Sequence, residues 1–302
     1  MSASPGGVDG PRCAVKSQRE TAATSRKIFS SCEKMNEVFG WLRRRVTSVS
    51  VPSSATATAT MRSLDRAIDV LEVLENAHTG LRLSEIARRA NLHVATTQRI
   101  LGALEARGRV ERDDSRYRAG AALLFGAHAY LTASPLVSAA RPILQDLAAE
   151  TGLASSVFVR TGHSRAIIAR VEGSDPLRYE LPVGERLPLH VGAGKVLAAQ
   201  LEPAEIDSLV LEVAPFTTAS GHEVNADGLR AELEEVRARG YSLSYGERVL
   251  GHRSVAAPVR SREGVVVAAI QIAGTSESFP EERVEAMSAA IRNAAEALGR
   301  RL

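Results

Sequence analysis

The chain has 302 residues, of which 44% are hydrophobic, so it is long enough for about two domains with buried cores. Residues 1–60 carry nine Lys or Arg and four Asp or Glu, which leaves 29 basic and 31 acidic residues from Met61 onward, so an anion must bind there through local clusters. Both cysteines, Cys13 and Cys32, precede Met61, which excludes disulfides and cysteine-ligated metals from the body of the chain. With no apolar run of roughly 20 residues and no signal-peptide pattern, we expect a cytoplasmic protein without a membrane partner.

The first segment, residues 1–60, is rich in Ser, Ala, Thr and Gly and ends in a low-complexity run, which predicts a disordered extension. Within it, residues 26–46 suit one amphipathic helix ending in three arginines, which would favour contact with DNA or an anionic membrane. Alternatively, Met61 is the true start of translation. The sequence leaves these alternatives open.

A DNA-binding module is predicted over residues 61–119, where helical spacing begins behind Ser63 as an N-cap. Residues 82–106 then predict two short helices, with Ser84 as the cap of the first and Asn91 in the left-handed conformation that ends it. The second of these helices has one side for packing: Thr97, Ile100, Leu101 and Leu104.

The opposite face of that second helix is small and carries a single cation, Arg99. Such a face fits a DNA major groove about 12 Å wide, as in a helix-turn-helix, although an ordinary packed helical hairpin is the alternative. Two short strands around the turn 113–115 predict a hairpin wing, whose arginines would lie beside the phosphate backbone: Arg112, Arg116 and Arg118. Residues 82–118 hold nine arginines and five acidic residues, and this local excess favours DNA binding over a merely solvated face.

Residues 120–133 are predicted to form a linker helix that is apolar almost all round. Such a helix is costly to leave in water, so we expect it to make a dimer contact, with packing on its own wing as the alternative.

The remainder, residues 134–302, alternates between helical and strand-like patterns and predicts an α+β domain. It opens with a helix capped by Ser134 and ended by Gly152. Six strands of a mostly antiparallel sheet are expected at 155–159, 166–171, 177–181, 241–245, 254–259 and 265–273. Helices are expected at 191–199, 204–213, 226–238 and 280–302.

Two stretches of this domain suggest a ligand site. In the first, Gly192, Ala193 and Gly194 expose the backbone before a helix, which would offer a carboxylate or phosphate free N–H groups. Lys195 is the only lysine after Met61, and it would serve an enzyme as a Schiff-base or general-base lysine; no acid-base partner is evident in the sequence, and a surface lysine in a tight turn is the alternative.

The second stretch, residues 240–259, carries a polar set dense enough to line a small-molecule site: Tyr245, Glu247, His252, Arg253 and Ser254. Metal binding through His190 and His252 would need a third ligand such as Glu247 or His222, and no ligand spacing singles one out. We therefore expect no metal, and we expect no cofactor.

Several motifs occur in the order found in the IclR family of transcriptional regulators, and the chain resembles that family over residues 62–302. The matching segments are SEIARRANL, TTQRILGALEARGRVER, YRAG, RPILQDLAAETG, LPLHVGAGKVLA and RGYSLSYGE followed by AAPV. The resemblance implies a winged helix-turn-helix, a linker helix and a GAF-like ligand-sensing domain. It also implies a homodimer or dimer of dimers on a pseudo-palindromic operator in double-stranded DNA, with a small organic acid as effector.

Carried over from the family, the effector-binding residues would be Gly192, Ala193, Ser244, His252, Ser254, Gln271 and Ala273. The residues expected at the DNA are Thr96, Gln98 and Arg99 of the second helix and Arg116 of the wing. The family commonly has Pro-Lys-Ser in the turn before the recognition helix, whereas this chain has His93-Val94-Ala95, so a cation and a capping hydroxyl are both missing. Weaker or differently read DNA is the expected consequence.

The leading hypothesis is a DNA-binding transcriptional regulator, with repression favoured over activation. A small carboxylate would change its affinity for DNA, and the chain would not be an enzyme. Two alternatives from other classes stay open: a small-molecule enzyme that uses Lys195, and a sensor that acts through protein contacts alone.

Overall fold

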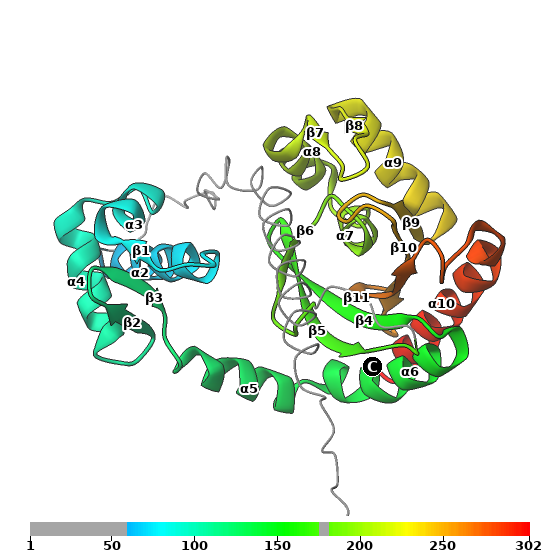
Figure 1. The fold of residues 1–302 in the computed structure, drawn as a ribbon, viewed down its shortest axis with the longest axis horizontal. Coiled ribbons are helices and arrows are strands. Elements are labelled where there is room, and N and C mark those ends of the chain that lie inside the picture. The colour runs from blue at the N-terminus through cyan, green and yellow to red at the C-terminus, as the bar shows by residue number, and fades with distance from the viewer. Residues whose placement is uncertain (1–58, 175–180) are drawn as a thin grey trace, which may run out of the picture. The chain divides into compact units, whose positions relative to one another are not determined.

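The computed structural model describes residues 59–174 and 181–302 (Figure 1). The predictions for residues 1–58, including the helix at 26–46, lie outside the described residues, as does most of the strand predicted at 177–181. The DNA-binding unit and the C-terminal domain are described separately below.

The DNA-binding unit is a three-helix module with a small antiparallel sheet. Its elements are α2 (Ala59–Glu75), β1 (Leu81–Arg82), α3 (Leu83–Arg89), α4 (Val94–Glu105), β2 (Val110–Asp113) and β3 (Arg116–Ala119). The strands lie in the order β1-β3-β2, with Leu81 opposite Tyr117. One core joins the helices to this sheet, and its buried members are Val70, Leu74, Leu81, Ile86, Leu101, Val110 and Tyr117. The predicted winged helix-turn-helix is confirmed.

Two of the predicted helix starts were wrong. Helix α2 already begins at Ala59, so Ser63 lies inside it rather than at its N-cap. Helix α3 begins after Arg82, so Ser84 lies in its first turn rather than at its N-cap, and the Arg82 backbone N–H donates to the Glu85 carboxylate at 3.1 Å. Asn91 has the predicted left-handed conformation, with φ of 54°.

Helix α5 (Leu123–Ala133) follows the wing and, within the described part of the chain, buries none of its side chains. Its large apolar residues Leu124, Phe125 and Tyr130 are exposed. Among the described residues no single helix is long and apolar enough to cross a membrane; α5 and the helix after it, α6 (Pro135–Thr151), pass that test only as a pair, bent by 72°.

The C-terminal domain is built on a six-stranded sheet in the order β6-β5-β4-β11-β10-β9, in which every neighbouring pair is antiparallel. The strands are β4 (Ala154–Thr161), β5 (Ser164–Val171), β6 (Arg186–Pro188), β9 (Ser242–Tyr245), β10 (His252–Arg260) and β11 (Val266–Thr275). Five of these overlap the predicted strands, and β6 is a short edge strand that the sequence pattern missed. With three residues, β6 is too short to show a period.

Helices cover both faces of this sheet (Figure 1). On one face lie α6 (Pro135–Thr151) and α10 (Val284–Gly299), the latter preceded by a 3₁₀ turn at Glu281–Arg283. On the other face lie α7 (Ala193–Ala198), α8 (Pro203–Val213) and α9 (Ala226–Arg239), with a small hairpin of β7 (Phe216–Thr217) and β8 (Glu223–Val224). Successive side chains of a strand point to opposite faces, so Val157 joins the first core and Phe158 the second.

The ends of α6 follow the predicted chemistry, and α9 is capped in a similar way. The Ser134 hydroxyl accepts the Val137 N–H at 3.4 Å, and helix α6 ends at Gly152, whose φ is 74°. Asn225 caps α9 by accepting the Gly228 N–H at 2.8 Å, and Gly240 ends that helix in the left-handed conformation. These caps fix where the helices deliver the chain into the sheet.

Candidate functional site

The recognition helix α4 presents a small polar face. Buried Thr97 and Leu101 anchor the helix to the core of the DNA-binding unit, as expected from their spacing. Gln98 and Arg99 lie on the exposed side, while Thr96 is half-buried at its edge. Of the three residues expected at DNA on this helix, Gln98 and Arg99 are therefore the better exposed.

The first turn of α4 has no side-chain cap. Its N-cap residue is His93, and in the described part of the chain no side chain there accepts a hydrogen bond from the free N–H groups of the helix. The Thr97 hydroxyl donates to the His93 carbonyl at 3.2 Å, which holds the turn from the opposite side. Residue 95, where the family commonly has Ser, lies inside the first turn of α4, so the position that lacks a side-chain cap is His93.

The wing arginines are engaged by the DNA-binding unit itself. The Arg116 guanidinium donates to the Gly80 carbonyl at 2.7 Å, and Arg112 donates to the Asp114 carbonyl at 2.8 Å. Arg118 pairs with Glu111 at 3.0 Å. All three side chains are exposed, so these contacts orient the guanidinium groups at the surface without burying them.

The C-terminal domain contains a cavity of about 40 Å³ at the edge of its sheet. Six of the seven residues expected at the effector line it: Gly192, Ser244, His252, Ser254, Gln271 and Ala273. The seventh, Ala193, is buried beside them in the first turn of α7. The other residues that line the cavity are Phe158, Arg165, Leu181, Leu187, Glu247, Arg248, Val249 and Arg253.

Strand register brings these side chains together. Ser254 of β10 lies opposite Ser244 of β9 on one side and Ala273 of β11 on the other. Gln271 is two residues before Ala273, so its side chain points to the same face of the sheet. Three strands that are adjacent in space therefore form one wall of the cavity.

Arg165 is a lining residue that the sequence interpretation missed. Only 3% of the surface of Arg165 is exposed, and its guanidinium donates to the Pro188 carbonyl at 2.6 Å and to the Val191 carbonyl. The guanidinium carbon lies 5.1 Å from the centre of the Phe158 ring. Arg165 is two residues from Ile167 and so shares its buried face of β5, and an arginine on the apolar face of a strand is the signal that would have revealed it.

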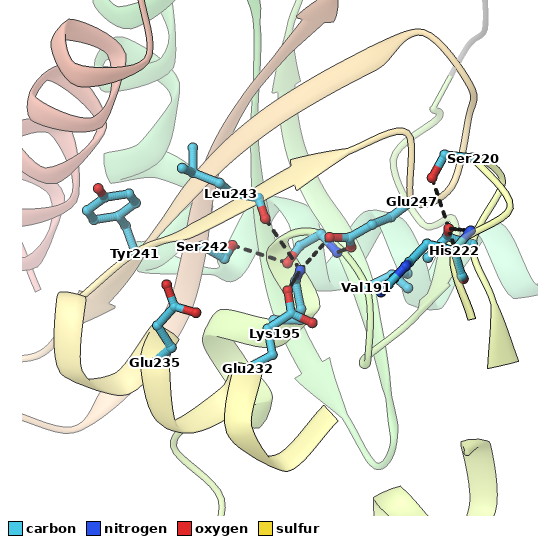
Figure 2. Close-up of polar contacts among 12 residues, drawn as sticks. Val191, Lys195, Ser220, His222, Glu232, Glu235, Tyr241, Ser242, Leu243 and Glu247 are labelled. Atoms are coloured by element: carbon cyan, nitrogen blue, oxygen red, sulfur yellow. Dashed lines mark hydrogen bonds and ion pairs between the residues drawn. The ribbon is translucent and has the colours of Figure 1, made fainter. Parts of the chain in front are cut away.

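Lys195 is buried rather than exposed, which corrects the surface-lysine alternative. Lys195 is 0% exposed. Its ammonium group forms ion pairs with Glu232 and Glu247 and donates to the Leu243 carbonyl at 3.3 Å (Figure 2). Glu232, Glu247 and Leu243 follow Lys195 in the sequence by 37, 52 and 48 residues, so no local sequence pattern predicts these contacts. The structure thus supplies two carboxylate partners for Lys195 that were not evident in the sequence.

The Glu247 carboxylate also occupies the backbone donor that the sequence assigned to a ligand anion. Its second oxygen accepts the Gly192 N–H at 2.8 Å, while its first binds Lys195. The Ser242 hydroxyl, in turn, donates to the Gly192 carbonyl at 3.2 Å (Figure 2). The Gly192 N–H is thus already satisfied by the chain's own carboxylate.

Formal charges around the cavity are mainly positive. Arg165, Arg248 and Arg253 line it together with one carboxylate, that of Glu247. Arg253 also pairs with Glu281 at 3.3 Å and stacks over the Tyr245 ring at 5.2 Å. Since Lys195 in turn pairs with Glu247, the described lining residues carry an excess of positive formal charge.

Two histidines near the cavity are held neutral. Burial, reinforced by the charges of Arg165 and Lys195, lowers the pKa of His190 to about 4. Burial also lowers the pKa of His252, against a hydrogen bond with the Leu250 carbonyl. A neutral imidazole at His252 is able to donate to or accept from a ligand.

The four residues considered for a metal do not form a ligand set. Within residues 59–174 and 181–302, no group of three or more His, Cys, Asp or Glu side chains is arranged to hold a metal ion. Glu247 is committed to Lys195 and Gly192, and His190 stacks on Phe216 with ring centres 4.5 Å apart.

Known proteins resemble the chain along most of its length. The IclR helix-turn-helix domain matches residues 63–114, and the bacterial transcriptional regulator IclR C-terminal domain matches residues 128–300. The HTH-type transcriptional regulator BhcR of Paracoccus denitrificans is 32% identical, over 79% of this chain and 86% of its own. The transcriptional repressor IclR of Escherichia coli is 30% identical, over 81% of this chain and 92% of its own.

The fold has solved counterparts as well. The structure of an IclR homologue from Microbacterium hydrocarbonoxydans superposes with a TM-score of 0.61 at 24% identity, covering 80% of this chain and 98% of that one. Together with the helix-turn-helix and the lined cavity, these matches confirm the predicted family, fold and class of function. The chain belongs to the IclR family: it is a DNA-binding transcription regulator.

Proposed function

We propose that the effector is a small organic acid, which binds in the C-terminal cavity and alters the affinity of the chain for DNA. The observation that carries this proposal is the buried guanidinium of Arg165, which lines the cavity together with Arg248 and Arg253. In a site with little water, opposite charges attract more strongly than in bulk solvent, so this guanidinium favours the binding of a carboxylate.

The cavity volume supports a ligand of few atoms. At about 40 Å³ the cavity is small. The Microbacterium homologue is complexed with 4-hydroxybenzoate, which is a property of that protein. For the present chain we propose an acid smaller than an aromatic one.

On the DNA side we propose contacts from Thr96, Gln98, Arg99 and Arg116. The exposed face of α4 supports the first three, and the fixed guanidinium of Arg116 supports the last as a phosphate contact beside the groove. Arg99 is exposed, and no hydrogen bond or ion pair ties it to the rest of the described chain, so it is the base-reading residue of this proposal. We further propose repression, as in the relatives named repressors.

A homodimer or dimer of dimers on a pseudo-palindromic operator is also proposed. Helix α5 supports it, because an isolated helix that exposes Leu124, Phe125 and Tyr130 is expected to bury them against a second copy. We also propose that the protein acts in the cytoplasm, since its proposed partner is DNA.

We propose that the chain is not an enzyme. The enzyme hypothesis needs Lys195 to reach a substrate, whereas its ammonium group is fully buried and held by two carboxylates. Turnover that is lost in Lys195→Ala would contradict this.

The effector proposal is tested with the purified full chain and its own promoter fragment. A small acid should raise the melting temperature and change the mobility shift of the DNA, since only a ligand that does both is an effector. The matched neutral amide of the same acid serves as the control and should do neither. If no small acid changes both readouts, the organic-acid effector is wrong.

The DNA interface is tested with Arg99→Ala, which should weaken binding by about 1 to 3 kcal/mol if Arg99 reads a base. Arg230→Ala, an exposed arginine of α9, is the matched control and should bind DNA like the wild type. An unchanged shift for Arg99→Ala removes that residue from the interface. Failure of the wild-type chain to protect promoter DNA would favour the sensor that acts through protein contacts alone.

A further inference from the structure

The cavity offers hydrogen-bond acceptors as well as cations. Gln271 is 8% exposed and lines the cavity, and its side-chain oxygen has no hydrogen-bond partner within the described residues. A buried acceptor without a partner costs free energy, so a ligand that donates to it gains more than one that does not.

Glu247 is a second acceptor in the same lining. One of its oxygens binds Lys195 and the other the Gly192 N–H, which uses two of about four lone-pair directions of a carboxylate. Its side chain is 14% exposed, so part of the carboxylate still faces the cavity. Since like charges repel, a ligand carboxylate avoids this end, whereas a hydrogen-bond donor is attracted to it.

The acceptors lie close to a cation. A side chain at Gly192 would place its Cβ 3.3 Å from an Arg165 guanidinium nitrogen and 4.0 Å from the Gln271 oxygen. A cation and an unpartnered acceptor therefore converge on one small region. A ligand whose carboxylate and donor are on neighbouring atoms meets both within this small region.

We propose that the effector is a small carboxylate that bears a hydrogen-bond donor, a hydroxyl or an ammonium group, on the carbon next to the carboxylate. The carboxylate pairs with the guanidinium of Arg165, and the donor binds the Gln271 oxygen and the free side of Glu247. This inference rests on the proposed function, because it specifies which small acids the cavity accepts.

Three acids with one carbon skeleton test it: propionate, lactate and alanine carry a hydrogen, a hydroxyl and an ammonium group at the same carbon. Isothermal titration of the full chain should show lactate, in one enantiomer, or alanine binding about tenfold tighter than propionate, as one hydrogen bond provides. Which of the two binds tighter distinguishes the neutral donor from the charged one. Propionate binding as tightly as both overturns the inference and leaves the proposed function intact. No binding by any of the three also overturns the inference, and the proposed function is then decided by the melting and mobility-shift measurements with other small acids.

A variant identifies the residue that reads the donor. Gln271→Met removes the acceptor at similar length, so the affinity for the donor-bearing acid should fall to that for propionate, while propionate binding stays within about twofold. Propionate thus reports that the cavity is intact in the variant. An equal loss for both acids would show that Gln271 supports the cavity without reading the donor, and that result would contradict the inference.

Discussion

The cations of the DNA-binding unit and those of the C-terminal domain are used in opposite ways. All nine arginines between Arg82 and Arg118 are exposed, and the contacts of the wing arginines are with backbone carbonyls or a surface carboxylate. In the C-terminal domain, Lys195 and Arg165 are 0% and 3% exposed and are fixed by partners from distant segments. The arginines of the DNA-binding unit contribute through their combined charge at the surface, whereas each buried cation of the C-terminal domain contributes through its specific contacts.

The physical difference is solvation. An exposed guanidinium keeps most of its hydration, so each surface ion pair contributes little and the group stays available for a phosphate. A buried ammonium or guanidinium has lost that hydration, and every remaining donor must be matched by an acceptor. Substitutions should therefore have unequal effects in the two regions.

The largest expected effect is at Lys195. Lys195→Met leaves the carboxylates of Glu232 and Glu247 buried or half-buried without their cation, which should cost about 3 to 5 kcal/mol in the unfolding of the C-terminal domain. Urea denaturation of the full chain measures it. The matched control is Arg230→Met, whose pair with Asp207 is exposed and is worth at most about 1 kcal/mol. Equal losses in the two variants would remove the distinction between buried and exposed cations.

A smaller effect is expected from His190 in acid. Its pKa is about 4 in the folded chain and 6.5 in the unfolded one, so between these values the unfolded chain binds more protons. The free energy of unfolding should therefore fall as the pH drops from about 6.5 to about 4, by up to about 3 kcal/mol. His190→Gln should flatten that dependence relative to the wild type, whereas His128→Gln, at an exposed position, should not. Identical pH profiles for wild type and His190→Gln would contradict the buried neutral imidazole.

The smallest expected effect lies at the exposed start of α4. His93→Ser supplies an oxygen for the uncapped N–H groups and should stabilise the DNA-binding unit by about 1 kcal/mol. His93→Ala, which has no such oxygen, is the control. Thermal unfolding followed by circular dichroism compares them, and equal melting temperatures would show that the turn has no missing cap.

Local patterns predicted most of the elements because local forces form them. The spacing of Thr97 and Leu101 indicated the buried face of α4, and Ser134 with Gly152 marked both ends of α6. The errors have equally local causes: Ser84 is not the cap because α3 begins earlier, after Arg82, which places Ser84 inside the first turn. The short strand β6 carried too few residues to show a period.

The candidate site was only partly predictable. The family resemblance supplied residues that the structure gathers around one cavity, such as Ser244, Ser254 and Gln271. Composition had no means to show that Arg165 is buried at the same cavity, or that Glu247 fills the backbone donor at Gly192. Both facts depend on strands and loops that pair over tens of residues.

By itself, the sequence determined the order of the elements, the winged helix-turn-helix and the excess of exposed arginines, since these follow from periodicity, caps and local charge. Tertiary structure alone decided which charges lose their water. The sequence presents Lys195 as a lone lysine beside three small residues, and the fold places it against Glu232 and Glu247 with no contact with solvent. Desolvation depends on what the chain brings over a residue from far away, and no nearby residue reports it.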